Sequence, residues 1–168
     1  MKQKVSHQTL FRIIVTRHRQ KVANLETALL GNHNIPFPEY GEERSLLMAG
    51  TFCVTITHCR TDGDKATVAF VVANAALGSE KNTMVFLSTD GVWCAVKGEA
   101  EKINEGAPFA PLKELIDKFV AGGGKILVCT PCMKKRGITE DQLIAGATPA
   151  GGAALVEWLA NGSPVVAY

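Results

Sequence analysis

The sequence predicts an α/β fold in which a mostly parallel sheet is covered by helices on both faces. Hydrophobic residues make up 46% of the 168-residue chain and charged residues 20%, a composition typical of a globular protein with a substantial core. Ile126, Leu127 and Val128 form an uninterrupted apolar run, which is typical of a strand buried on both sides. Strand-like and helix-like segments alternate as β-α-β-α-β-α-β, an order that implies right-handed crossovers between parallel strands.

The first half of this alternation runs through two strands. Residues 51–57 are rich in β-branched side chains and predict the first strand. Residues 66–77 are mainly apolar and predict a helix, and residues 82–88 predict the second strand. Residues 92–96 then predict a short helix, followed by a polar loop over residues 98–107.

The second half begins with an amphipathic helix over residues 112–121, because a proline precedes its apolar face and three glycines end it. Residues 125–129 predict the third strand. Residues 139–145 open with the Thr-x-x-Gln pattern of a capping box and predict a short helix. Residues 151–160 predict the last helix, and residues 164–168 a terminal strand.

The helix over residues 66–77 is apolar on nearly all sides. Such a helix must be covered on more than one side. In a chain of this size we expect a second subunit to supply part of that cover, so the sequence predicts a homo-oligomer.

Residues 1–47 differ from the rest of the chain. They contain three of the four histidines and a stretch at 31–41, rich in asparagine and proline, that fits no regular element. We expect them to be an N-terminal extension (a docking arm, a mobile tail or a non-native start ahead of Met48) without a catalytic role. Residues 48–168 then form the α/β domain.

The charge distribution argues against a nucleic-acid partner. Residues 1–50 carry seven Lys/Arg against four Asp/Glu, whereas residues 51–168 carry eleven against twelve, so the body is close to neutral. No run approaches the roughly 18 apolar residues that span a bilayer. Basic residues between positions 17 and 21 interrupt the apolar centre that a signal peptide needs. We therefore expect a cytoplasmic protein that binds neither nucleic acid nor membrane.

The five cysteines are an odd number in a chain without a secretion signal, which favours reduced thiols over a disulfide framework. Two of them, Cys129 and Cys132, form a Cys-x-x-Cys pair at the carboxyl end of the third predicted strand, where α/β folds place their chemistry. Three cations, which would favour the nucleophilic thiolate at Cys132, and a glycine that can end the turn follow the pair: Lys134, Lys135, Arg136 and Gly137.

The Cys-x-x-Cys pair has three interpretations. A zinc site needs two more ligands, and no second such pair exists, so no metal is expected. A redox dithiol of the thioredoxin kind begins a long helix, whereas Gly137 leaves room for about one turn and a small helix dipole. A nucleophilic or persulfide-carrying site needs only exposure and nearby cations. Cys132 follows a proline beside these cations, whereas Cys129 continues the apolar run. We therefore expect Cys132 to be reactive and Cys129 to be supporting or structural.

The remaining candidates carry weaker signals. Cys53 and Cys94 lie in apolar segments and are expected to be packed. His58 ends the first strand, close to the crevice where α/β sheets bind ligands, and is kept as a supporting residue. Asp90 is most simply a turn residue. Neither a dinucleotide fingerprint nor a P-loop occurs, so no nucleotide cofactor is expected.

These features together resemble the DsrE/DsrF-like sulfur-relay family, including its YchN-like members. The resemblance extends over about residues 50–168 and rests on the apolar first helix and on four sequence features: Thr57-His58, Leu87-Ser-Thr-Asp-Gly-Val-Trp93, Cys129-x-x-Cys132-x-x-x-Arg136-Gly137-Ile138, and Leu143-Ile-x-Gly146-Ala147.

The resemblance implies a flavodoxin-like three-layer fold and assembly into trimers or hexamers. It also implies that Cys132, flanked by Arg136 and Gly137, accepts sulfur as a persulfide and passes it from a donor protein to an acceptor thiol, as a sulfurtransferase-like carrier. Relay subunits proper carry a single cysteine, whereas this chain carries a pair. Two alternatives therefore stay open: a thiol-disulfide or peroxiredoxin-like oxidoreductase that uses both cysteines, and a non-catalytic scaffold subunit.

Overall fold

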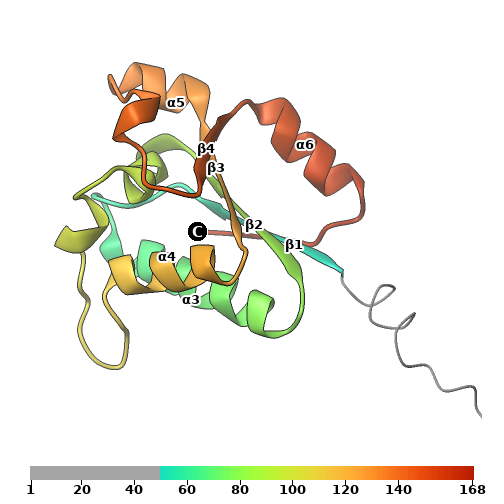
Figure 1. Cartoon of the computed structure of the whole chain (residues 1–168), viewed down its shortest axis with the longest axis horizontal. Helices are drawn as coiled ribbons and strands as arrows, with labels where there is room; N and C mark the ends of the chain where they lie inside the picture. Colours follow the sequence, from blue (N-terminus) through green and yellow to red (C-terminus); the bar gives the residue numbers. More distant parts are fainter. Residues whose placement is uncertain (1–49) are drawn as a thin grey trace, which may run out of the picture. The chain divides into compact units, whose positions relative to one another are not determined.

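The computed structural model describes residues 50–168, whose centre is a five-stranded sheet in which every neighbouring pair of strands is parallel (Figure 1). The strand order is β4-β3-β2-β1-β5. The strands are β1 (Thr51–Ile56), β2 (Asn82–Leu87), β3 (Lys125–Cys129), β4 (Ala147–Ala150) and β5 (Val165–Ala167).

Helices cover both faces of this sheet, with α3 and α4 on one face and α6 on the other (Figure 1). This arrangement confirms the predicted three-layer α/β fold. The α-helices are α3 (Gly63–Gly78), α4 (Leu112–Ala121), α5 (Thr130–Lys135) and α6 (Gly152–Ala160), and the 3-10 helices are η1 (Thr89–Ala95), η2 (Ala100–Lys102) and η3 (Glu140–Gln142).

The larger part of the core lies between the sheet and the α3–α4 layer. Alternate strand residues point into it, including the fully buried Val54, Val85 and Val128. Phe70 of α3 and Phe119 of α4 meet edge to face, with ring centroids 5.9 Å apart. This contact joins the two helices above the sheet.

The opposite face has a smaller core beneath α6, built on Cys53, Met84 and Phe86. No residue of α6 is fully buried, and Val156 of this helix is 67% exposed. Val165 on the edge strand β5 is 49% exposed. The α6 side of the domain therefore presents apolar side chains to its surroundings.

The strand β4 was not predicted from the sequence. Its residues, Ala-Thr-Pro-Ala, contain a single β-branched side chain and a proline, which usually argues against a strand. The structure accommodates Pro149 because β4 is an edge strand that pairs only with β3. An edge position spares the proline a ladder hydrogen bond that it could not donate.

The first predicted helix is longer than expected, because α3 begins at Gly63 rather than at residue 66. Asp62 caps it, since its Oδ1 accepts a hydrogen bond from the Lys65 N–H at 3.0 Å. Ala69, Phe70 and Ala73 are fully buried against the sheet and α4 of the same chain. The sheet and α4 of the same chain therefore bury part of the apolar surface of α3 that we expected another subunit to bury.

The other short helices differ in extent from their predictions. The helix expected at 92–96 is the 3-10 helix η1, which begins at Thr89, and the helix expected at 139–145 is the three-residue η3. The predicted extension over residues 1–47 and its boundary lie outside the described residues. Over residues 50–168, no helix is both long and apolar enough to cross a membrane.

Candidate functional site

The cysteine pair lies where β3 ends and α5 begins. Cys129 is the last residue of β3 and the N-cap of α5, and Pro131 occupies the first turn of this helix. Gly137 ends the turn with a φ of 66°, in the left-handed region that glycine adopts without strain. Cys129 and Cys132 are both partly exposed, whereas the sequence predicted exposure for Cys132 and a more buried place for Cys129.

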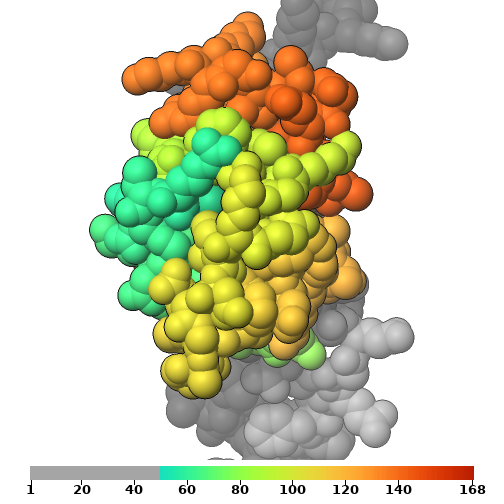
Figure 2. Space-filling model, turned by 90° about the vertical axis from the view of Figure 1, so that its left-hand side faces the viewer, coloured from blue at the N-terminus to red at the C-terminus, as the bar shows by residue number. Residues whose placement is uncertain are grey.

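The sulfur of Cys132 accepts a hydrogen bond from the main-chain N–H of Thr89, at an N···Sγ distance of 3.2 Å. Thr89 begins η1, two residues after the end of β2, and donates its own hydroxyl to the carbonyl oxygen of Thr57, at 2.6 Å. The carboxyl ends of three adjacent strands, β1, β2 and β3, thus meet at this cysteine. In Figure 2 the segments that follow these strands lie side by side on one face, coloured teal, lime and orange.

Arg136 is the predicted cation that the structure connects to the cysteines. Its Nη1 donates to the carbonyl oxygen of Cys132 at 3.1 Å. Lys134 and Lys135 are exposed, and no hydrogen bond or ion pair links either of them to the sulfur of Cys132. The hydrogen-bond donor to this sulfur is thus a main-chain amide, which the sequence did not indicate.

Cys129 is kept in its protonated form. Burial, followed by a hydrogen bond with the Cys132 thiol, raises the pKa of Cys129, although the charge of Arg136 acts in the opposite direction. A protonated thiol is a weak nucleophile. The two thiols of the pair therefore have different environments.

His58 lies at the end of β1 and is held by Thr57. The ring Nδ1 is 2.9 Å from the Thr57 hydroxyl, which itself donates to the main-chain oxygen of Tyr168 at 2.8 Å. Because the hydroxyl hydrogen goes to Tyr168, Nδ1 of His58 is the donor in the first bond. No hydrogen bond joins His58 to Cys129 or Cys132 in the described part of the chain, so its supporting role stays a prediction.

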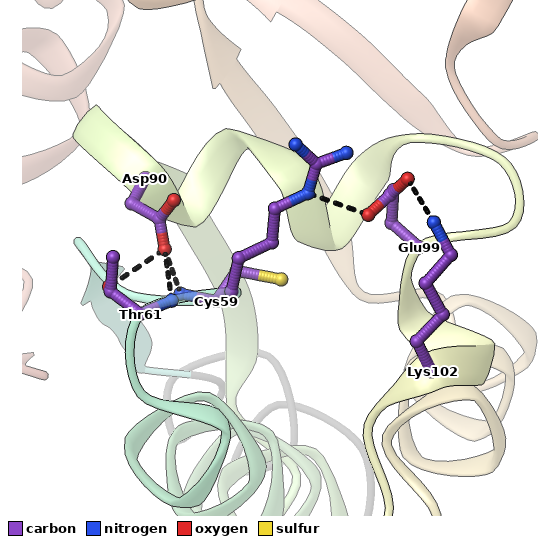
Figure 3. A network of polar contacts seen from close by, with 6 residues as sticks. Cys59, Thr61, Asp90, Glu99 and Lys102 are labelled. Carbon is purple, nitrogen blue, oxygen red and sulfur yellow. Dashed lines mark hydrogen bonds and ion pairs between the residues drawn. The ribbon is translucent and has the colours of Figure 1, made fainter.

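Asp90, which the sequence suggested was a simple turn residue, connects two loops beside the site. Its Oδ2 accepts hydrogen bonds from the Cys59 N–H (2.8 Å), the Thr61 N–H (3.0 Å) and the Thr61 hydroxyl (2.8 Å) (Figure 3). Burial alone would raise the pKa of Asp90, but these bonds and the charge of Arg136 hold it below its usual value. A charged Asp90 thus fixes the β1–α3 loop against η1.

A second polar cluster lies next to Asp90 and was also missed. Arg60 stacks 3.4 Å from the centroid of the Trp93 ring, and its Nε donates to Glu99 at 2.7 Å. Lys102 binds the other carboxylate oxygen of Glu99, also at 2.7 Å (Figure 3). The hydrogen bond from Arg60 is the main cause that lowers the pKa of Glu99 from 4.5 to about 2, although burial opposes it.

Glu99→Gln should make the domain less stable at pH 7 by about 1–2 kcal/mol, a figure reduced because Arg60 and Lys102 are exposed. The folded pKa lies below the unfolded one, so the contribution of Glu99 is complete above pH 4.5 and is lost as the pH falls towards 2. Urea unfolding at several pH values should therefore show the wild-type and variant curves converging in acid. Glu114→Gln, at an exposed position of α4, should change stability by less than about 0.5 kcal/mol at pH 7. A difference between wild type and Glu99→Gln that is constant with pH would contradict this account.

The other three cysteines are fully buried, as predicted for Cys53 and Cys94. Burial raises the pKa of Cys53 to about 11. A hydrogen bond with Cys59 and burial together raise the pKa of Cys94 well above that of an ordinary thiol. Within residues 50–168 no three histidine, cysteine or acidic side chains form a cluster that could hold a metal ion.

The fold and the site together place this protein among the α/β domains that carry a partly exposed cysteine pair at the carboxyl edge of a parallel sheet. The sequence profile of the DsrE/DsrF-like family matches residues 51–168, and the chain belongs to this family. This finding confirms the resemblance drawn from the cysteine segment and the strand ends.

The curated relatives are themselves uncharacterised archaeal proteins. The chain is 32% identical over 100 residues to protein MJ0760 of Methanocaldococcus jannaschii, a match that covers 60% of this chain but only 36% of that protein. It is 28% identical over 115 residues to protein MK0008 of Methanopyrus kandleri, covering 68% of this chain and 91% of the relative.

Two solved structures share the fold. The YchN protein from E. coli superposes with a TM-score of 0.58 at 17% identity, covering 70% of this chain and 99% of YchN. Protein MTH1491 from Methanobacterium thermoautotrophicum superposes with a TM-score of 0.52 at 14% identity, with coverage of 70% and 99%. At these identities the likeness concerns the fold alone.

Proposed function

We propose that this protein carries sulfur as a persulfide on Cys132 and passes it to the thiol of a partner protein. One observation carries this proposal. Cys132 is partly exposed at the carboxyl edge of the sheet, and its sulfur accepts a hydrogen bond from the main-chain N–H of Thr89. Membership of the DsrE/DsrF-like family supports the same chemistry.

The transfer has two steps in which bonds and charges balance. In the first, the Cys132 thiolate attacks the outer sulfur of a donor persulfide, so that an S–S bond forms on Cys132 and the donor leaves as a thiolate. In the second, an acceptor thiolate attacks the outer sulfur of the Cys132 persulfide. The acceptor becomes the persulfide, and Sγ of Cys132 leaves as a thiolate. Cys129 would support Cys132 as a neighbouring protonated thiol, and Arg136 would fix the turn through the Cys132 carbonyl oxygen.

A thiol-disulfide exchange function is the second candidate, and the presence of two free, partly exposed cysteines in one Cys-x-x-Cys pair favours it. Oxidation would remove two electrons and two protons from Cys129 and Cys132 and form one S–S bond, while a peroxide is reduced to water and an alcohol or to two waters. A third candidate is a scaffold subunit in which neither reaction takes place.

Assembly and location belong to the same proposal. We propose a cytoplasmic homo-oligomer, a trimer or hexamer, which binds sulfur donor and acceptor proteins and neither nucleic acid nor membrane. The exposed apolar side chains Val156 and Val165 on the α6 side support an interface there. Residues 1–47 are proposed to be an extension outside the catalytic domain, which begins at residue 48.

Mass spectrometry after incubation with a low-molecular-weight persulfide tests these candidates. We expect one added sulfur atom per chain, which is lost in Cys132→Ser and kept in Cys129→Ser, because only Cys132 acts as the nucleophile. A disulfide between Cys129 and Cys132 formed by peroxide, without an added sulfur, would favour the oxidoreductase. If neither product forms, the scaffold subunit is the candidate function that remains. Native spectra of the same samples give the subunit number, and a monomer would contradict the proposed oligomer.

A further inference from the structure

We infer that the main-chain N–H of Thr89 is a catalytic donor to the sulfur of Cys132, and that the Thr89 side chain positions this donor. The inference rests on the proposed function of Cys132 and adds a group from a different strand end to the reaction. Its starting point is the N···Sγ distance of 3.2 Å between the two residues, which are 43 positions apart in the sequence.

The backbone conformation of Thr89 is unusual for its residue type. Its φ is +48°, whereas β-branched residues rarely adopt the left-handed region. Such a conformation is unfavourable for a β-branched residue and persists only where surrounding contacts impose it. Among residues 50–168, Glu80, in the turn after α3, is the only other non-glycine residue with a positive φ. At Thr89 the unusual conformation coincides with an N–H directed at a cysteine sulfur.

The contacts that impose this conformation surround Thr89 on both sides. Its hydroxyl donates to the Thr57 oxygen at 2.6 Å, and the N–H of Ser88 donates to the Ile56 oxygen at 2.9 Å. Asp90 binds two N–H groups of the β1–α3 loop, and Gly91 lies directly against the main chain of Ile56. The segment 88–91 is thus fixed to the end of β1, which leaves the Thr89 N–H facing β3 and α5.

A fixed N–H donor at this sulfur serves both steps of a sulfur transfer. When Cys132 attacks the donor persulfide, the N–H stabilises the attacking thiolate. When the acceptor attacks, Sγ of Cys132 becomes the leaving thiolate, and the same N–H stabilises the charge that develops there. Because the donor is already oriented, the reaction needs no rearrangement to provide it.

The test compares Thr89→Val with Thr89→Ser in a Cys129→Ser background, where Cys132 is the one cysteine that is not fully buried. Valine keeps the shape of threonine but loses the hydroxyl, and with it the side-chain hydrogen bond to Thr57 that helps to hold Thr89 in the left-handed conformation. Serine keeps the hydroxyl. We expect Thr89→Val to lower the iodoacetamide alkylation rate at pH 7 about fivefold, the effect of one net hydrogen bond, and Thr89→Ser to change it less than about twofold. The pH of half-maximal alkylation should rise in Thr89→Val alone.

A purely structural role for Thr89 would lower the melting temperature of Thr89→Val without moving its pH profile, and this result would overturn the inference. Equal alkylation by Thr89→Val and Thr89→Ser would also overturn it. Alkylation involves no sulfur transfer, so the two proposals fail separately. If the wild type takes up no sulfur from the persulfide but Thr89→Val still shifts the alkylation profile, then the donor role holds and the sulfur-carrier function fails.

Discussion

Gly91→Ala should destabilise the domain by about 3 kcal/mol, at the upper end of the range for overpacked sites. A Cβ at position 91 would lie 2.3 Å from the carbonyl oxygen and 2.8 Å from the carbonyl carbon of Ile56. Both are main-chain atoms at the end of β1, which lies between β2 and β5, so no rotamer change relieves the overlap. Segment 88–91 must therefore move away from β1, and the Thr89 N–H moves with it.

Urea unfolding of Gly91→Ala should show a lower midpoint, and its Cys132 should be alkylated more slowly at pH 7 than that of the wild type. Gly152→Ala is the matched control, because nothing lies within 4 Å of a Cβ at this position and Gly152 is the first residue of α6. Alanine there should be neutral or stabilising by up to about 1 kcal/mol, since alanine has the higher helix propensity. If both variants unfold at the wild-type midpoint, the close approach of Gly91 to β1 does not exclude a side chain at position 91.

The sequence was sufficient to predict most of the fold because the strands bury their side chains. Val54 and Ile56 in β1 and the apolar run in β3 face the core, so their patterns carry the information directly. The strand β4 could not be predicted in this way. Main-chain pairing with β3 and an edge position that tolerates Pro149 define it, and neither leaves a pattern in the local sequence.

The site was predictable only in part, for a comparable reason. Cys129 and Cys132 are visible as a motif, and their place at a strand end follows from the order of the elements. The donor from Thr89 depends on a single φ angle and on a contact across 43 positions, and main-chain N–H groups have no sequence signature. Asp90 could have been noticed, since an Asp-Gly pair three residues after a buried strand is well placed to bind the neighbouring loop.

The structure adds to the cysteine pair a contact that the sequence did not suggest, the main-chain N–H of Thr89 at the sulfur of Cys132. The run of three cations indicated that positive charge activates Cys132, but Lys134 and Lys135 are exposed and Arg136 binds a carbonyl oxygen. A hydrogen bond is short-ranged and weakly affected by salt, whereas attraction to exposed lysines is screened at a Debye length of about 8 Å in physiological salt. A main-chain donor therefore keeps its effect on the sulfur under conditions that weaken the contribution of the lysines.

Phe119→Ala is expected to cost about 3–5 kcal/mol, because it removes a fully buried ring from the core. The ring packs edge to face on Phe70 and joins α3 to α4. It also approaches Gly124 so closely that a Cβ there would lie 2.4–2.6 Å from three atoms of the ring. Gly124→Ala alone should therefore cost about 1–3 kcal/mol through overpacking.

The two substitutions should not add, because they act on the same space. In the Phe119→Ala background the overlap with the ring is gone, and the methyl group that Gly124→Ala introduces fills part of the cavity. We expect the double variant to be more stable than the sum of the single effects predicts by about 1–3 kcal/mol. Urea unfolding of the wild type, both single variants and the double variant measures this coupling. Additive losses would mean that the Phe119 ring does not limit the space at position 124, and this result would contradict the account.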